Sequence, residues 1–128
     1  MELQDYFNNC KVYIWKETFA VVKSNKSFHG AFANIVDHNE ITVIIDQLKI
    51  DDLDVIEIEK GWKILTFGVE LPFELVGFVA QIAKELADKN ISILVISSFS
   101  TDHILVKEND LTITKRTLET LGCIVENK

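Results

Sequence analysis

The sequence contains a single arginine, Arg116, and its 13 basic residues face 20 acidic ones, so its formal net charge at pH 7 is −7. Nucleic-acid binding draws most of its non-specific affinity from contacts between cations and phosphates, and this balance argues against a nucleic-acid partner. Phosphoryl-transfer sites usually need arginine or lysine clamps or a glycine-rich cradle. The five glycines form neither a GxGxxG nor a GxxxxGK pattern, so these classes are largely excluded.

Long apolar runs and a secretory leader are also missing. No apolar run reaches the roughly 18–20 residues that a membrane-spanning helix requires. The sequence starts with acidic and polar residues, without a basic n-region or an apolar h-region. We therefore expect a cytoplasmic protein with no membrane partner. Cys10 and Cys123 have no motif spacing, and free thiols are the expected state.

Few residues could bind a metal ion or act as nucleophiles. The candidates are Cys10, Cys123, His29, His38 and His103. None of them occur at zinc-ligand spacing, so we expect neither a metal site nor another cofactor. Neither cysteine lies in a segment that would present it as a nucleophile. An acylphosphatase would need a glycine-rich loop and an arginine after its first strand, but residues 68–73 read GVELPF. We therefore expect no catalytic activity.

Four segments in the second half are typical of strands, because they are short, apolar and rich in Ile, Val or aromatic residues. The almost continuously apolar run at 91–97 predicts a central, buried strand. The polar break at 98–101 then predicts a hairpin. The predicted strands are residues 62–67, 91–97, 102–108 and 123–126.

Two helices complete this half. Between residues 74 and 88 the apolar side chains recur at helical spacing, and Asn90 is a candidate left-handed C-cap. A second helix begins after residue 109 or 110 and ends at Gly122. The order β-α-β-β-α-β predicts a ferredoxin-like α+β module. Right-handed crossovers place both helices on one face of a four-stranded antiparallel sheet.

The first half has little helical signal and four strand-like segments. The triplet at 37–39 (Asp-His-Asn) is typical of a turn and predicts that the strands on either side of it pair. The acidic cluster at 51–54 predicts a loop or a short turn. The predicted strands are residues 18–23, 31–36, 40–46 and 54–59.

Three motifs of the second half are characteristic: GWKILTFG at 61–68, PFELVGFVAQIAKELADKNISILVIS at 72–97 and SFSTDHILVKEND at 98–110. With these motifs the chain resembles the ACT family, in particular its ACT_7 or CASTOR-type branch of tandem amino-acid sensors, and the last motif is similar to that branch's "S-T-[FY]-x-[TF]-D-[YFH]-x-L-V" signature. The resemblance implies an ACT domain at 61–128, preceded by a degenerate ACT-like module at 1–60. In that first half, Val36 and Asp37 stand where the family commonly has Arg-Thr.

The resemblance also implies a function. ACT modules are regulatory: they bind a small ligand, usually a free amino acid, at interfaces between modules, commonly associate through sheets or helices, and often occur fused to biosynthetic enzymes. The resemblance therefore implies a homodimer and an enzyme as a further partner. We therefore expect a small-molecule-binding regulatory protein without catalytic activity. The alternative is an ACT-fold module kept for dimerisation or for docking on an enzyme, which ignores amino acids. A third reading, a small enzyme, would depend on one of the histidines or cysteines.

The ligand-binding residues that the resemblance implies lie at the start of the first helix and in the hairpin that follows it. They are Phe73, Glu74, Leu75, Val76, Gly77, Ser98, Phe99, Thr101 and Asp102. N–H groups at a helix start can hold a carboxylate, and Asp102 can hold an ammonium group. Each of four positions has an alternative role. Gly77 permits close packing of the helix on the sheet, and Asp102 caps a turn. Phe99 lies in a subunit interface, and Glu74 is a favourable anion in the first turn of the helix.

Overall fold

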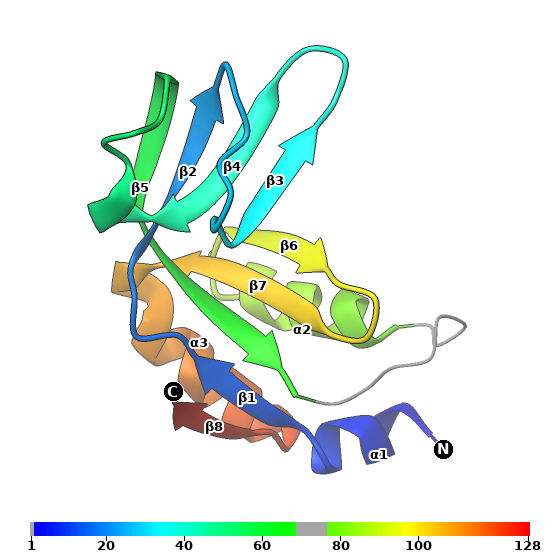
Figure 1. Cartoon of the computed structure of the whole chain (residues 1–128). Coiled ribbons are helices and arrows are strands. Elements are labelled where there is room, and N and C mark those ends of the chain that lie inside the picture. Colours follow the sequence, from blue (N-terminus) through cyan, green and yellow to red (C-terminus); the bar gives the residue numbers. More distant parts are fainter. Residues whose placement is uncertain (1, 69–76) are drawn as a thin grey trace. The chain divides into compact units, whose positions relative to one another are not determined.

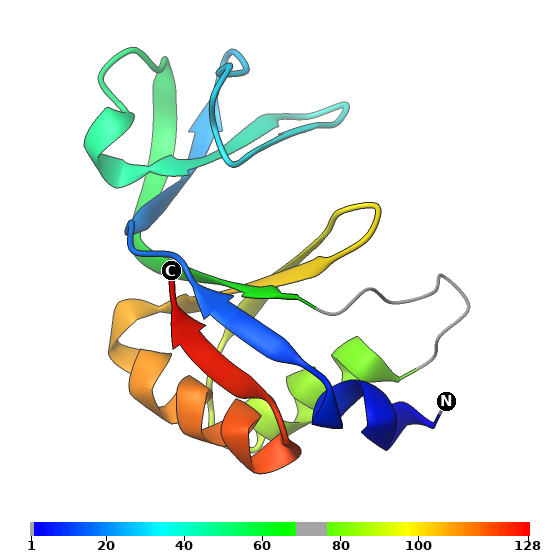
Figure 2. The same ribbon diagram turned by 60° about the horizontal axis from the view of Figure 1, so that its bottom comes forward.

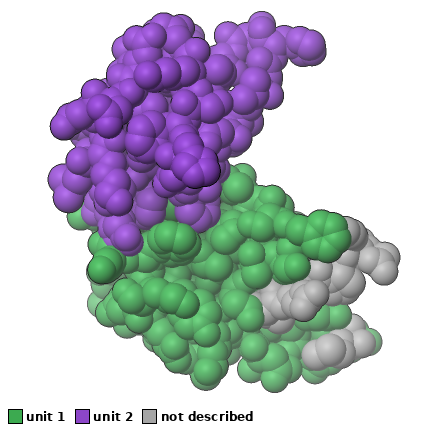
Figure 3. Space-filling view, in the orientation of Figure 1, with its two compact units in different colours: residues 1–16, 63–128 green, residues 17–62 purple. Residues whose placement is uncertain are grey.

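The computed structural model of the chain describes residues 2–68 and 77–128 (Figure 1). The chain divides into two compact units, which Figure 3 shows in different colours. Unit 1 comprises residues 1–16 and 63–128, and unit 2 comprises residues 17–62. The boundary expected near residue 60 lies close to the end of unit 2. Residues 1–16, however, belong with the C-terminal part of the chain, so unit 2 is an insertion within unit 1.

Unit 1 is built on a mixed sheet with the strand order β6-β7-β5-β1-β8. Its strands are β1 (Lys11–Ile14), the last part of β5 (Val55–Phe67), β6 (Ile93–Ser97), β7 (Asp102–Lys107) and β8 (Ile124–Asn127). The order β5-α2-β6-β7-α3-β8 confirms the predicted ferredoxin-like α+β fold. The predicted four-stranded sheet has gained β1, which pairs antiparallel with β5 and parallel with β8.

Three helices accompany this sheet: α1 (Leu3–Asn8), α2 (Phe78–Ala87) and α3 (Leu111–Leu121). Figures 1 and 2 show α2 and α3 on the same face of the sheet. The buried side chains Phe78, Ile82 and Leu86 recur along α2 at the predicted helical spacing. Asn90 has a φ of +61°, as expected for the left-handed residue after this helix. Both features confirm the predicted helix, although residues 74–76 lie outside the described part of the chain.

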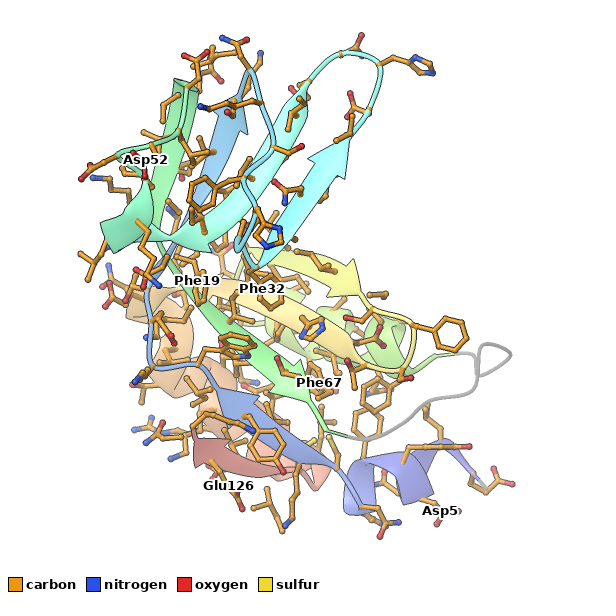
Figure 4. All side chains as sticks on the ribbon, in the orientation of Figure 1. Asp5, Phe19, Phe32, Asp52, Phe67 and Glu126 are labelled. Carbon is orange, nitrogen blue, oxygen red and sulfur yellow. The ribbon has the colours of Figure 1, made fainter. Side chains whose placement is uncertain are left out.

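The core of unit 1 lies between this helical face and the sheet. Phe67 contributes a fully buried ring, which packs edge to face on Phe78 with 5.5 Å between centroids (Figure 4). From β1, Val12 and Ile14 enter the same core, with 0% and 6% of their surface exposed. The N-terminal strand is therefore an integral part of unit 1. The predicted division at residue 60 had placed this strand in the first half of the chain.

The predicted position of one strand is wrong. The apolar run at 91–97 suggested a central strand, but β6 pairs only with β7 within the described residues and lies at the edge of the sheet. Leu94 and Val95 are 36% and 42% exposed. A continuous apolar run favours burial on both faces, but it does not specify how many neighbours the strand has.

Unit 2 is an antiparallel sheet with the order β3-β4-β2-β5. Its strands are β2 (Phe19–Ser24), β3 (Ala33–Val36), β4 (Ile41–Asp46) and the first part of β5. The β3–β4 hairpin confirms the predicted pairing, and its turn is closed by N–H groups of Asn39 and Glu40 that donate to Asp37 Oδ1 at 2.8 and 3.0 Å. Within residues 17–62, all of which the structure describes, the only helical segment is the 3-10 turn η1 (Gln47–Lys49).

The core of unit 2 is small. Ala20, Val22, Val43 and Ile45 are buried together on one face of the sheet. At the start of β2, the rings of Phe19 and Phe32 meet edge to face, with 6.0 Å between their centroids (Figure 4). Side chains from loops cover this face in place of the two helices that cover the sheet of unit 1.

Candidate functional site

The hairpin between β6 and β7 brings four of the predicted site residues together. The N–H of Ser98 donates to the carbonyl oxygen of Thr101 at 2.8 Å, which closes a tight turn around Phe99. One residue further from the tip of the turn, the Ser97 hydroxyl donates to Asp102 Oδ1 at 2.6 Å. Ser97 and Asp102 are directly opposite each other in the β6–β7 ladder. The turn thus presents a hydroxyl group, a half-buried carboxylate and an aromatic ring within one short segment.

Two alternative roles predicted from the sequence concern this turn: a turn cap for Asp102 and a subunit interface for Phe99. Asp102 does close the hairpin, as a cap would, but the closure uses its Oδ1 atom and leaves the side chain partly accessible. Phe99 is 82% exposed, so most of its ring surface lies outside the core of unit 1. An exposed ring of this size fits a role in binding, either of a ligand or of another subunit.

The other predicted site residues begin α2. Phe73, Glu74, Leu75 and Val76 lie outside the described residues, so their approach to Asp102 stays a prediction. Gly77 is the N-cap of α2 and has a φ of +99°. A side chain there would be strained by the left-handed backbone, whereas an added Cβ would only reach ordinary contact with Leu3, at 3.4 Å. The backbone conformation therefore explains this glycine better than close packing does.

A buried histidine, which is not among the predicted site residues, adjoins the turn. His103 is 7% exposed, and its two ring nitrogens face two hydroxyl groups. Nδ1 lies 2.8 Å from Thr66 Oγ1, and Nε2 lies 2.7 Å from Ser98 Oγ. Thr66 Oγ1 also accepts a hydrogen bond from the indole N–H of Trp15 at 2.8 Å. We call these four residues the His103 network.

The electrostatics of the His103 network favour a neutral imidazole. Burial lowers the pKa of His103 below its ordinary value, and the nearby charge of Asp102 only partly opposes this effect. The imidazole therefore carries one ring hydrogen at neutral pH and can act as a donor on one side and an acceptor on the other. A signal for this residue was present in the sequence, because a histidine within the apolar run of β7 must find polar partners. Trp15 and Thr66 could not be found without the pairing of β1, β5 and β7.

The two cysteines are free thiols, as predicted, and both are buried. They are adjacent, because Ile124 N–H donates to the carbonyl oxygen of Cys10 at 2.9 Å and the thiols themselves form a hydrogen bond. This hydrogen bond raises the pKa of Cys10 and lowers that of Cys123. Their place inside the core of unit 1 suits a packing role.

A shallow groove of about 550 Å³ lies on the sheet of unit 2. Lys23 lies in it, with its Nζ atom 3.9 Å from Glu40 Oε1. Glu57 and Glu59 line the same groove. The groove is lined by none of the predicted site residues that the structure describes.

Residues 2–68 and 77–128 contain no group of three or more His, Cys, Asp or Glu side chains that could hold a metal ion. No helix in the same ranges is both long enough and apolar enough to cross a membrane.

Comparison with known proteins identifies the family. A family model described as an ACT domain (ACT_7) matches residues 57–120, half of the chain, and includes the β6–β7 turn and the start of α2. The protein belongs to the ACT-domain family. No curated protein sequence matches the chain.

Solved structures show the same fold over nearly the whole chain. A structural-genomics protein from Agobacterium tumefaciens is 23% identical with a TM-score of 0.78, and the match covers 93% of each chain. A protein of unknown function from Vibrio cholerae is 18% identical with a TM-score of 0.76, over 94% of this chain and 95% of that one. A C-terminal regulatory domain of aspartate kinase from Porphyromonas gingivalis is 18% identical with a TM-score of 0.59, over 87% of this chain and 95% of the other.

Proposed function

We propose that the protein is a regulatory module that binds a free amino acid and has no catalytic activity of its own. The observation that carries this proposal is the exposed turn between β6 and β7, which lies inside the matched ACT domain and gathers Ser98, Phe99 and Asp102. The structural likeness to regulatory domains of aspartate kinases supports the same reading. A cytoplasmic location is part of the proposal, and buried free thiols are consistent with it.

The chemistry of the turn fits both charged groups of an amino acid. An ammonium group that leaves water needs an anion, and Asp102 offers one. A carboxylate needs hydrogen-bond donors, which the Ser98 hydroxyl and the N–H groups at the start of α2 can supply. Phe99 can cover the aliphatic part of the ligand. The segment at 73–76 remains part of the proposed site.

We also propose that unit 2 is the degenerate partner module expected of a tandem ACT protein. Its hairpin at 33–46 corresponds to the hairpin at 93–107, and its sheet lacks the two covering helices. No basic residue stands at Val36 or Asp37, so the ligand contacts in this proposal come from unit 1 alone.

The test is a thermal unfolding screen of the full chain against the twenty amino acids at millimolar concentration. A ligand at a hundred times its dissociation constant adds about 2.7 kcal/mol to the free energy of unfolding. Such a gain moves the melting temperature by several degrees. A flat panel for the folded protein would contradict the proposal.

A matched pair of variants tests the site. Asp102→Asn should abolish the response to the amino acid, because it removes the charge that faces the ammonium group. Asp52→Asn removes one charge from an exposed turn of unit 2 and should leave the response intact. Equal dissociation constants for wild type and Asp102→Asn, measured by calorimetry, would show that the ligand binds elsewhere.

A second candidate function, dimerisation, has its own support in β6. This strand has an open edge within the described residues, and its residues Ile93–Ser97 carry no charge, although the whole chain carries −7. Two copies can therefore pair at this edge without like-charge repulsion and satisfy their free backbone groups. We propose a homodimer formed through β6, which an enzyme partner could recognise.

Sedimentation equilibrium distinguishes this dimer from other associations. Val95 lies on this edge strand and is 42% exposed. Val95→Lys places a charge there and should shift the protein to monomer. Ile113→Lys changes an equally exposed apolar residue of α3, also at 42%, and should leave the dimer unchanged. A wild-type monomer, or the same mass for both variants, would exclude the β6 interface.

A further inference from the structure

The His103 network lies on the face of the unit 1 sheet that α2 and α3 do not cover. Along β7 the side chains alternate, so Ile104 and Val106 enter the core beneath the helices and His103 points to the opposite face. Trp15, directly after β1, and Thr66 of β5 reach this face by the same alternation. The network ends at Ser98, which is exposed in the β6–β7 turn.

The first member of the network favours one direction for its hydrogen bonds. An indole N–H can only donate, so Thr66 Oγ1 accepts from Trp15 at 2.8 Å. The Thr66 hydroxyl keeps its own hydrogen to donate, and Nδ1 of His103 lies within hydrogen-bond distance of it, at 2.8 Å. A neutral imidazole that accepts at Nδ1 carries its hydrogen on Nε2, which points at Ser98 Oγ over 2.7 Å.

We propose that His103 is a positioning residue, which donates from Nε2 to Ser98 Oγ and so turns the Ser98 hydroxyl hydrogen outward, toward the carboxylate of the bound amino acid. This inference rests on the proposed function and assigns a role within the same site. With one lone pair of Ser98 Oγ engaged by His103, the hydroxyl hydrogen no longer has that ring as an acceptor. A carboxylate accepts only, and a hydrogen bond to it is stronger than one to a neutral acceptor.

The opposite direction would give Ser98 a different chemistry. The distance between Ser98 Oγ and His103 Nε2 also fits a nucleophile and its general base. That role requires a hydrogen on Nδ1, which a carboxylate partner would favour. The partner of Nδ1 is instead the Thr66 hydroxyl, which carries no charge and has a hydrogen of its own to donate. The geometry therefore favours a donor at Nε2 and a binding role for Ser98.

The first experiment reads the tautomer directly and needs no ligand. Long-range ¹H–¹⁵N correlation spectra of the uniformly labelled full chain, recorded at pH 8, should show His103 with its hydrogen on Nε2. The His103→Gln spectrum identifies its signals among those of the three histidines. Thr66→Val removes the donor to Nδ1 at nearly constant shape and should weaken this tautomer preference. A hydrogen on Nδ1 in the wild type would overturn the inference.

The second experiment measures binding of each amino acid that stabilises the wild type. A glutamine amide can occupy the place of Nε2, whereas an asparagine amide reaches only the place of Nδ1. We therefore expect His103→Asn and Ser98→Ala each to weaken binding about tenfold, as for loss of a hydrogen bond to a charged group. His103→Gln should stay within about threefold of the wild type.

The outcomes separate this inference from the function on which it rests. If no amino acid stabilises the wild type, the proposed function fails, and the ligand part of the inference fails with it. If the wild type binds an amino acid but Ser98→Ala binds it equally well, only the inference fails. Equal losses in His103→Gln and His103→Asn would show that the ring acts through packing and not through Ser98.

Discussion

Replacement of Val12 by alanine tests whether the N-terminal strand is an integral part of unit 1. Val12 lies at the centre of β1, between Phe67 of β5 and Val125 of β8 in the ladders, and none of its surface is exposed. Its side chain belongs to the same core as the buried residues of α2. If β1 were a peripheral arm, its truncation would have little effect on stability.

The expected cost follows from this burial. Val12→Ala removes two methyl groups, and each buried carbon of this kind contributes about 0.8 kcal/mol by transfer from water. The cavity that remains adds to the loss, because neighbouring strands relax only in part. We expect the free energy of unfolding to fall by about 2–3 kcal/mol. For a chain of this size the melting temperature should fall by roughly 5–15 °C.

Urea unfolding, followed by circular dichroism, gives the free energy directly, and an unchanged slope would show that the same surface unfolds. Val36→Ala is the matched control, because the same two methyl groups are removed from a side chain that is 66% exposed. Its effect should remain within about 0.5 kcal/mol. Equal midpoints for the two variants would refute the assignment of β1 to the core.

Three further predictions concern single sites. Gly122 ends α3 with a φ of +116°, where an alanine side chain is strained. Gly122→Ala should therefore lower the free energy of unfolding in urea by about 1–2 kcal/mol, and an unchanged value would contradict this reasoning. Thr114→Val should be neutral or stabilising by up to about 1 kcal/mol, because the fully buried Thr114 hydroxyl has no hydrogen-bond partner among the described residues; a large loss would reveal such a partner. The pKa of His103 is lowered in the folded state, so the unfolded state binds the proton more readily and stability falls as the pH decreases below about 6.5 toward the folded pKa. Urea midpoints between pH 8 and pH 5 should fall less for His103→Gln than for the wild type, and parallel curves would exclude this linkage.

Regular amphipathic and turn patterns made much of the fold predictable from the sequence. The stripe of Phe78, Ile82 and Leu86 specifies α2, since only a helix places these residues on one face. Asp37 specifies the β3–β4 turn through its own side chain, which accepts two backbone N–H groups. Such features depend on residues that are close in sequence, and they could therefore be predicted.

Features that depend on pairing between strands far apart in the sequence could not be predicted. Four residues of β1 are too few to show a period, and Val12 becomes a core residue only because β5 and β8 lie on either side of it. The same holds for the candidate site. The turn at 98–102 was found by its motif, but Trp15 and Thr66 reach His103 only through the order of β1, β5 and β7 in the sheet.

The insertion of unit 2 within unit 1 has a consequence for the order of folding during synthesis. Unit 2 is continuous in sequence, at 17–62, and all its strands have left the ribosome long before the chain is complete. In unit 1, by contrast, β1 must wait for β8, its parallel neighbour, and the two strands lie more than a hundred residues apart (Lys11 pairs with Ile124). Such a long-range pairing slows folding. Until β8 has been synthesised, the apolar side chains of β1 and the uncharged edge of β6 are both exposed. Chaperones that bind the chain during synthesis should therefore bind chiefly to unit 1.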